Sequence, residues 1–586
     1  MFNNVNIKNG FFGYDVFDDN GKVKYFNELG RAVILDDVCQ SIEDGVIVWR
    51  VSFDYLGSTK HFEFERSNIA KKELVSVLQG QGADITAKSF NYFIDSMRLQ
   101  ECQVGRGTNT FKRTGWIQLP YRNTLEYHYR CGELISSVDA DYVGSLVLTP
   151  QGDYESWKSM VESEVIGRVQ LETILLASIS AIIVGIHGMN ATTDNPIYHI
   201  NARSGTGKST ASWLAGSVYG EPFDGMRHSC DDHGVMKQYF SVYGSWGATA
   251  KATVSAHAGN RGTVAVINEL GKFVGNDMTT VVFNLSEGSD IKRLNTRLDT
   301  LVTEGFNTVF ISNGEMSLIG RCKSKLEGIK NRVMEITVPM TESAEHSRRI
   351  KDVCTHNNGH VAPKIAQYII DNGSYQMIQS LYEETLTELS ASAPEYISGR
   401  FIEKFPVFLV MASKIAEKAL GITFNTQAVV DFCYECAKKF ADDEGDVDSS
   451  YTDVISECST NIRNFYQSGC ADIPLKVWGA ISYPNRVEGS KTVTIEYGVK
   501  KNTLKEILEK HGHPNMNTCI DIWKKAGVLN YEAGKNTRKR KVGPNDGDKE
   551  HLYILKVLED KKDEPSKKKS QLVRLLKDDE EESKDE

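Results

Sequence analysis

The sequence lacks the long hydrophobic run that a membrane-spanning helix requires. Its longest apolar stretch, TILLASISAIIVGI at residues 173–186, contains two serines and is shorter than the roughly 20 residues that cross a bilayer. The N-terminus also lacks a signal pattern. We therefore expect a buried helix at 173–186, no membrane association and a cytoplasmic location.

Paired cysteines are also scarce. The 11 cysteines are single residues, apart from Cys433 and Cys436. An odd total without a second CxxC pair argues against a disulfide framework and against a zinc site. We expect reduced thiols, with a structural role for Cys433 and Cys436.

Positive charge is in deficit, since the net charge is −10. The acidic residues concentrate in two segments, 441–450 and 577–586, and the basic cluster GKNTRKRK at 534–541 lies between them. Because binding surfaces depend on local charge, the global deficit does not exclude nucleic acid as a partner.

A chain of 586 residues is too long for one hydrophobic core, because single cores stop growing at roughly 250–300 residues. Composition and periodicity favour a multidomain α/β protein with five segments. We expect a strand-rich N-terminal domain at 1–150, an α/β domain with a mostly parallel sheet at 151–340, a helical lid-like domain at 341–450, a further small domain at 451–558 and a charged tail at 559–586 that does not fold alone.

The segment PIYHINARSGTGKST contains a candidate phosphate-binding loop between an apolar strand and a helix. Its glycines let backbone N–H groups approach a phosphate, its lysine neutralises phosphate oxygens, and the following hydroxyl reaches Mg²⁺. Ala202 replaces the usual first glycine, where small size is the main requirement. The predicted ATP-binding residues are Ser204, Gly205, Thr206, Gly207, Lys208, Ser209 and Thr210.

The strand TVAVINE at 263–269 fits the partner strand of such a site, with Glu269 as the candidate base that orients the attacking water. Asn268 stands where an aspartate is usual. Its amide oxygen can still accept a hydrogen bond from a metal-bound water, so Ser209 and Asn268 are the predicted magnesium residues. The alternative is that Glu269 has only a structural role as a cap or ion-pair partner.

Two further sites follow in the order expected of an oligomeric ATPase. The strand NTVFISNGE ends in Ser312 and Asn313, of which Asn313 is the candidate sensor of the γ-phosphate. Arg332 precedes the next strand, where it would act as an arginine finger toward a neighbouring subunit. Arg348 and Arg349 lie near the expected place of a second sensor.

Two basic segments are candidate DNA contacts. Lys292, Arg293 and Arg297 precede the sensor strand and could form a basic hairpin tip, although a solvated basic face explains them equally well. Two amphipathic helices near 502–528 and two strand-like arms beyond them predict a winged helix-turn-helix. Its wing tip would carry Lys535, Arg538, Lys539, Arg540 and Lys541. A winged helix that binds protein is the alternative.

In this order, the motifs resemble the AAA+ replicative helicases of mobile genetic elements, in particular the MCM-like, self-loading helicases of staphylococcal cassette chromosome elements and their phage relatives. The similarity spans residues 10–555 and includes RTGW (113–116), SWGATAKAT (245–253), INELG (267–271), ISNGE (311–315) and KNRVMEI (330–336). It implies an AAA+ P-loop ATPase core, ATP and Mg²⁺ as cofactors, a hexameric homo-oligomer, and unwinding of DNA in the 3′ to 5′ direction. Two alternatives remain: a DNA-binding initiator that uses ATP as a switch, and an ATPase that acts on protein partners.

Overall fold

The computed structural model describes residues 5–560, apart from 105–106, 123, 137, 192, 231–233, 276, 289–292, 295–299, 302–303, 323–326, 446–448, 469–473, 485–491, 512, 514–515, 533 and 546. The chain forms two compact units. The first comprises residues 1–276, 280–318 and 331–436, and the second 277–279, 319–330 and 437–586. The multidomain α/β class is confirmed, and the finer division into five segments stays a prediction.

The N-terminal part of the first unit is built mainly of strands. A meander of β1 (Val5–Lys8), β2 (Phe11–Phe17) and β3 (Val23–Arg31) precedes a sheet of order β11-β7-β4-β5-β6. That sheet contains β4 (Ile34–Ser41), β5 (Ile47–Tyr55), β6 (Ser58–Glu65), β7 (Thr108–Phe111) and β11 (Asp141–Tyr142). Helices α1 (Lys72–Gly80) and α2 (Phe90–Gln103) contribute to the same core, in which Trp49, Phe93 and Met97 are buried. A small sheet of β8 (Gly115–Tyr121), β9 (Thr124–Arg130) and β10 (Leu134–Ile135) follows.

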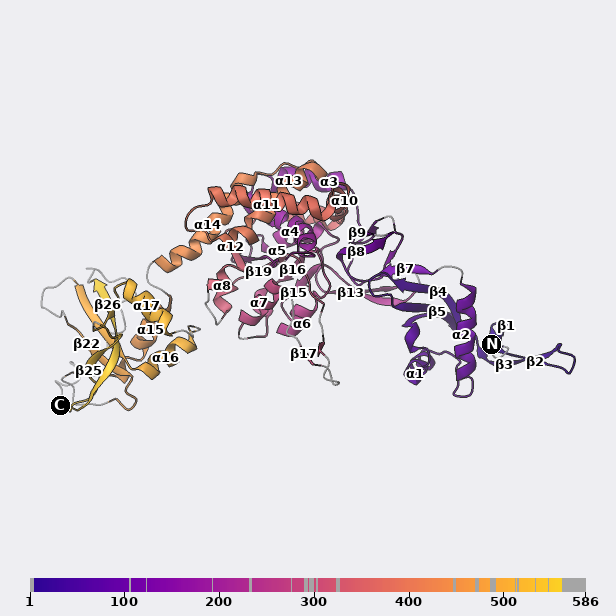
Figure 1. Cartoon of the computed structure of the whole chain (residues 1–586), viewed down its shortest axis with the longest axis horizontal. Helices are drawn as coiled ribbons and strands as arrows, with labels where there is room; N and C mark the ends of the chain where they lie inside the picture. Colours follow the sequence, from indigo (N-terminus) through magenta and orange to yellow (C-terminus); the bar gives the residue numbers. More distant parts are fainter. Residues whose placement is uncertain are drawn as a thin grey trace. The chain divides into compact units, whose positions relative to one another are not determined.

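A five-stranded parallel sheet forms the centre of the first unit. Its order is β15-β16-β19-β12-β20, with β12 (Ile197–Asn201), β15 (Tyr243–Ser245), β16 (Ala265–Asn268), β19 (Phe310–Gly314) and β20 (Val333–Ile336). The strands are short, and apart from the edge strand β15 they are almost continuously buried, as expected of a sheet covered on both faces. In Figure 1, α4 (Val169–His187) and α5 (Lys208–Ser217) lie on one side of it, and α6 (Ala250–Ser255) and α7 (Thr279–Glu287) on the other.

Helix α4 contains the apolar stretch predicted to be a buried helix. Among the described residues, it is the one helix long and apolar enough to cross a membrane, and its 18-residue apolar window is 89% buried inside the protein. It packs against α5 and α13 (Pro406–Leu420). A core helix therefore explains its composition.

Within the α/β segment 151–340, the composition of KQYFSVYG (237–244) predicts one strand of the parallel sheet, but this segment is divided in the structure. Its first part is β14 (Met236–Phe240), which pairs antiparallel with β13 (Met226–Cys230) in a separate exposed hairpin. Only the short β15 joins the parallel sheet. The prediction of a single strand was wrong because aromatic residues favour a strand equally in a buried sheet and in an exposed hairpin.

Helices dominate the remainder of the first unit: α3 (Tyr154–Met160), the π-helical turn η2 (Val161–Val165), α9 (Ala344–His356), α10 (Val361–Asp371), α11 (Ser374–Ser392), α12 (Gly399–Lys404) and α14 (Thr426–Gly445) as far as residue 436. Figure 1 shows α10, α11 and α13 gathered beside α4. Cys433 and Cys436 are buried in α14, and no group of three or more metal-ligating side chains occurs among the described residues.

The second unit contains α15 (Ser449–Thr460), α16 (Lys501–Lys510) and α17 (Met516–Lys525). These helices share a core with a sheet of order β21-β22-β23-β26-β24, in which Val454, Leu504, Ile520 and Trp523 are fully buried. Its strands are β21 (Phe465–Gln467), β22 (Gly479–Ser482), β23 (Thr492–Val499), β24 (Leu529–Asn530) and β26 (Lys549–Asp560), and β25 (Arg538–Lys541) pairs with β26.

Candidate nucleotide site and DNA-binding domain

The candidate phosphate loop, residues 202–207, connects the end of β12 to the first turn of α5. Gly205 and Gly207 have φ angles of +80° and +84°, which side chains rarely tolerate. A Cβ on Gly207 would lie 2.3 Å from Thr341 Oγ1, so this position has no room for a side chain. The backbone N–H groups of Met340 and Thr341 both donate to the carbonyl of Thr206, at 2.8 and 3.3 Å. The segment before α9 therefore holds the loop.

Ala202 occupies the position of the missing glycine. It directly follows β12, and its N–H donates to the carbonyl of Gly314 at 3.2 Å. An alanine therefore continues the strand pairing without obstructing the loop, which accords with the expectation that small size is enough here.

Lys208 begins α5 and is 8% exposed. Its Nζ donates to the carbonyls of Ala202 and Arg203, at 2.7 and 2.9 Å, and lies 3.8 Å from the carboxylate of Glu315. The ammonium group is thus held over the loop by its own backbone, close to where a phosphate would approach the N-terminal end of the helix.

The other predicted loop residues differ in exposure. Ser204 and Gly205 are exposed, whereas Thr206 and Ser209 are half-buried. The side chain of Thr210 is buried, so a contact from Thr210 to a nucleotide would come from its backbone N–H. The positive φ angles, the unpaired N–H groups that begin a helix and the placement of Lys208 fit a nucleotide phosphate, and Ser209 supplies a hydroxyl of the kind that Mg²⁺ accepts.

The carboxyl end of β16 carries Asn268 and then Glu269. Glu269 has φ +60° and ψ +80°, a strained conformation for a residue with a side chain. Its carboxylate accepts a hydrogen bond from the N–H of Gly271 at 3.3 Å and so caps the 3₁₀ turn η3 (Leu270–Lys272). Glu269 therefore makes the capping contact that a purely structural role would require. It directly follows β16, which lies beside β19.

Asn313, at the end of β19, connects the loop helix to Glu269. It is 1% exposed. Its Oδ1 accepts from the backbone N–H of Glu269 at 3.1 Å, and its Nδ2 donates to Ser212 Oγ on α5 at 2.8 Å. The amide that was predicted to sense a phosphate is thus engaged in holding the strained residue that would orient water.

Ser312, one residue earlier, faces a different group of residues. Its Oγ contacts His199 Nδ1 and Trp246 Nε1, each at 2.9 Å, and the other ring nitrogen of His199 contacts the carbonyl of Met316 at 2.9 Å. Burial lowers the pKa of His199, which keeps the ring neutral between these partners. Ser312 is therefore a buried link between β12, β19 and the residue after β15.

Arg332 directly precedes β20. In the parallel register Val333 pairs with Ile197, the first residue of β12, whereas the phosphate loop follows the last one. Arg332 is therefore level with residue 196, and the loop begins at residue 202. At about 3.3 Å per residue, these two positions are about 20 Å apart along the strand direction. Its guanidinium lies 3.3 Å from Glu287 and over the ring of Phe283.

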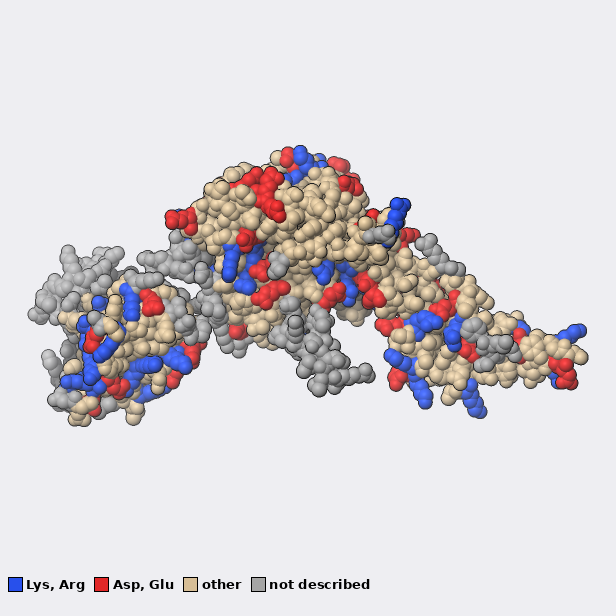
Figure 2. Space-filling model, in the orientation of Figure 1, with Lys and Arg blue, Asp and Glu red and all other residues tan. Residues whose placement is uncertain are grey.

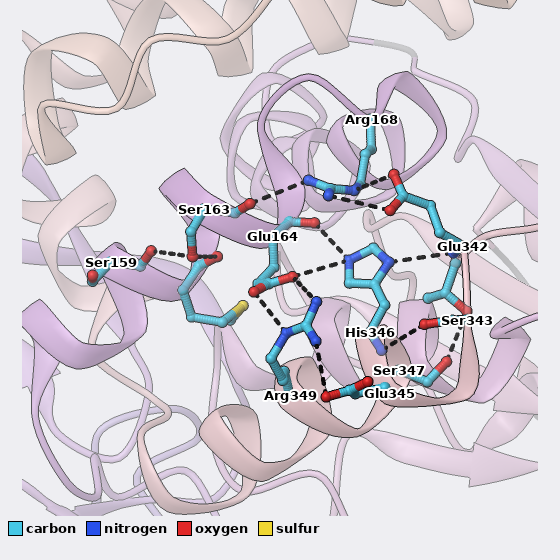
Figure 3. A network of polar contacts seen from close by, with 12 residues as sticks. Ser159, Ser163, Glu164, Arg168, Glu342, Ser343, Glu345, His346, Ser347 and Arg349 are labelled. Atoms are coloured by element: carbon cyan, nitrogen blue, oxygen red, sulfur yellow. Dashed lines mark hydrogen bonds and ion pairs between the residues drawn. The ribbon is translucent and has the colours of Figure 1, made fainter.

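A network of polar contacts connects the start of α9 to η2 (Figure 3). Arg349 donates two hydrogen bonds to the carboxylate of Glu164, at 2.8 and 3.0 Å, and lowers the pKa of that carboxyl group. The ring of His346 contacts the Glu164 carbonyl at 2.9 Å. Ser347 Oγ lies 2.7 Å from Thr341 Oγ1, the atom that packs against the second loop glycine. The second-sensor candidate Arg349 is thus paired with Glu164, whereas Ser347 on the same helix makes the contact that leads to the loop.

The segment predicted to form a basic hairpin tip contains β17 (Arg293–Leu294) and β18 (Thr300–Leu301), which pair antiparallel. Lys292 and Arg297 lie outside the described residues, as does the side chain of Arg293. Their contact with DNA stays a prediction.

The second unit has the helices expected of a helix-turn-helix, α16 and α17, with β25 and β26 beyond them. The wing differs from the prediction, because four of its five basic residues do not lie on a loop tip. Arg538, Lys539, Arg540 and Lys541 form β25 and pair with Leu552, His551, Glu550 and Lys549. Only Lys535 lies in the preceding connection, and the described bends and turn between β25 and β26 are at 543–545 and 547. A high charge predicts exposure, but it does not distinguish a turn from an edge strand.

Pairing in β25 gives its basic residues different environments, because successive side chains of a strand point to opposite faces. Lys539 is exposed. Arg540 lies 3.4 Å from the buried carboxylate of Glu496, which also accepts from Asn530 Nδ2 and Ser482 Oγ. Figure 2 shows lysine and arginine side chains gathered on the visible face of this unit. Arg540 therefore has a structural partner, whereas Lys539 is available to a ligand.

Comparison with known proteins gives matches to two family models. A model described as a domain of unknown function, DUF927, matches residues 65–297. A model described as the Cch helix turn helix domain matches residues 446–560. None of the curated proteins matches the sequence.

Among solved structures, one described as "SCCmec type IV Cch - active helicase" matches with a TM-score of 0.67 and 19% sequence identity, covering 98% of this chain and 99% of that one. At this identity the match shows the fold, and it extends through both compact units. The predicted resemblance is therefore confirmed: over nearly its whole length this chain has the fold of the Cch helicase, and it ends in a helix-turn-helix domain of the Cch type.

Proposed function

We propose that this protein is an ATP-dependent DNA helicase or translocase that works as a hexameric AAA+ ring in the replication of a mobile genetic element, moving 3′ to 5′ in the cytoplasm. One observation carries the proposal: Lys208, Asn313 and Glu269 lie at the carboxyl edge of one parallel sheet. Asn313 bonds to Glu269 and to Ser212, which is on the same helix as Lys208. The fold shared with a protein described as an active helicase supports the same function.

The chain's own residues can be given distinct tasks. The glycine loop and Lys208 bind the phosphates, and Ser209 with Asn268 would hold a hydrated magnesium ion, which would supply neutralisation of the phosphate charge. Glu269 orients the attacking water. Strand β19 lies between β12 and β16, so Asn313 is placed to fix Glu269 relative to the helix that follows the loop.

The position of Arg332 supports action between subunits. It lies at the sheet edge opposite to the loop of its own chain, so it would complete a neighbouring subunit's site rather than its own. A ring arrangement would give every site such an arginine. The β17–β18 hairpin and the helix-turn-helix domain are the proposed DNA contacts, through Lys292, Arg293 and Arg297 in the first case.

ATP hydrolysis by the full chain, measured with and without single-stranded DNA, tests this function. We expect DNA to stimulate turnover in the wild type, and Glu269→Gln to reduce turnover by about 10²-fold or more while ATP binding persists. Displacement of a labelled strand from a partial duplex then separates a helicase from a DNA-stimulated ATPase. Turnover that is independent of DNA would contradict the proposal.

One observation favours a second candidate, an initiator or assembly factor in which ATP is a switch. Asn268 adds no negative charge beside the metal, and the Glu269 carboxylate is engaged in capping η3. This candidate predicts ATP-dependent assembly on DNA with hydrolysis that DNA does not accelerate.

A further inference from the structure

Glu315 is an acidic residue beside the phosphate loop, and the sequence motifs give it no role. It follows β19, and its carboxylate lies 3.8 Å from Lys208 Nζ while its side chain is 54% exposed. Among the described residues, Lys208 is the only ion-pair partner of Glu315. The loop lysine is thus paired with a carboxylate at the mouth of the site.

The turn that carries Glu315 is fixed by buried groups on both sides. Met316, the next residue, accepts through its carbonyl from the ring of His199 on β12, at 2.9 Å. Ser317 donates to the buried carboxylate of Glu335 on β20, at 2.8 Å. Gly314, the preceding residue, pairs with Asn201 at the start of the loop. An exposed side chain on a turn anchored in this way stays close to the loop.

The charge of this site is unusual because Asn268 is neutral where a second acid is expected beside Glu269. When Lys208 turns to a nucleotide phosphate, Glu315 loses its counter-charge and faces a polyanion. Like charges at this range repel in a partly buried site, and a divalent cation on the phosphates relieves the repulsion.

We propose that Glu315 makes nucleotide binding at this site depend on a divalent cation, supplying the negative charge that Asn268 does not. This inference rests on the proposed function, because it requires that the loop binds ATP. Glu315 acts here through its charge near the phosphates and the metal, and it takes no part in the chemical step.

The test measures the affinity of the full-length protein for ATP, by calorimetry or with a fluorescent analogue, once with Mg²⁺ and once with EDTA. The quantity of interest is the ratio of the two dissociation constants. In Glu315→Gln we expect metal-free ATP to bind about tenfold more tightly, because one unit of like charge has been removed. Binding of Mg·ATP should change less than about threefold, so the ratio falls.

Two further variants complete the design. Asn268→Asp in the Glu315→Gln background returns an acid to the usual position and should restore the wild-type ratio. Glu417→Gln, an exposed change of equal charge on α13, should leave it unaltered.

An unchanged ratio in Glu315→Gln, with ATP still bound, would overturn the inference and leave the proposed function intact. The same holds if Glu417→Gln lowers the ratio equally, since the effect would then reflect total charge. If the wild type binds ATP neither with nor without Mg²⁺, the proposed function fails, and this inference fails with it.

Discussion

Asn313 offers a direct test of how the candidate base is held. Its amide accepts from the strained backbone of Glu269 at 3.1 Å and donates to Ser212 at 2.8 Å, and it is 1% exposed. Asn313→Ala removes both hydrogen bonds. At about 1 kcal/mol for each bond, and more for a buried group left without a partner, we expect a loss of about 2–4 kcal/mol in the unfolding free energy of the first unit.

The kinetic effect should be larger than the effect on nucleotide affinity. Without Asn313, the backbone N–H of Glu269 loses its side-chain acceptor and the conformation at φ +60° loses one of its supports. A displaced base loses its contribution of about 10²–10⁴ to the rate. We expect ATP hydrolysis to fall by at least about 10²-fold. Nucleotide affinity should stay within about threefold, because the loop backbone and Lys208 bind the phosphates independently of Asn313.

Two matched variants distinguish this positioning role from the sensor role that the motif suggests. Asn313→Asp keeps the oxygen that accepts from Glu269, and the hydroxyl of Ser212 can turn to donate to the new oxygen. It should therefore retain most of the activity, whereas a sensor that donates to the γ-phosphate would lose its function in this variant. Ser212→Ala removes only one hydrogen bond and should reduce the rate by less than about tenfold.

The assays are steady-state hydrolysis, equilibrium ATP binding and urea unfolding on the same preparations. The reasoning would be refuted if Asn313→Ala hydrolysed ATP at the wild-type rate. It would be refuted equally if Asn313→Asp were as inactive as Asn313→Ala, because the contact to Glu269 would then not be the one that matters.

Three further predictions concern other parts of the chain. Arg332→Ala should abolish hydrolysis but not ATP binding, and mixing it with Lys208→Ala should restore turnover, because mixed oligomers contain interfaces with both residues; no recovery would argue against action between subunits. Lys539→Ala should weaken DNA binding and lower the slope of log K against log salt by about 1, whereas Arg540→Ala should instead lower the stability of the second unit by about 1–2 kcal/mol, as urea unfolding and salt titrations can show. Burial lowers the pKa of His199, so the folded state favours the neutral ring. The unfolding free energy should therefore be highest above about pH 6.5 and decrease below that pH, by at most about 1.4 kcal/mol per pH unit. Urea unfolding at pH 7.5 and 5.5 should show a smaller difference in His199→Gln than in the wild type.

The strands and helices around the phosphate loop could be predicted because their signals are local. An apolar run before a glycine loop and a helix after it fall within some 20 residues, and β12, α5, β16 and β19 lie where these patterns place them. The resemblance to cassette chromosome helicases depended on the order of such motifs along the chain, which is also visible without a structure.

The contacts that define the site could not be predicted in the same way, because they join residues far apart in the sequence. Thr341 packs against Gly207, and Asn313 bonds to Ser212. No periodicity encodes either contact. The prediction that the basic cluster at 534–541 forms a wing tip was wrong for a different reason. Its charge indicated exposure, but the pairing of Arg538–Lys541 with β26 decides which side chains are exposed.

Asn268 and Ala202 depart from the usual motif in ways that the structure separates. Ala202 continues the pairing of β12 with the end of β19, so its methyl group has no chemical consequence for the loop. In the proposed nucleotide site, Asn268 removes a negative charge beside the metal position, and this changes the electrostatic potential at every group that would face the phosphates. A site with Glu269 held by Asn313 and with Glu315 beside Lys208 still contains two carboxylates, although they come from two different strands. The balance of charge at the carboxyl edge of this sheet, rather than any single motif residue, therefore decides how tightly the metal and nucleotide are coupled.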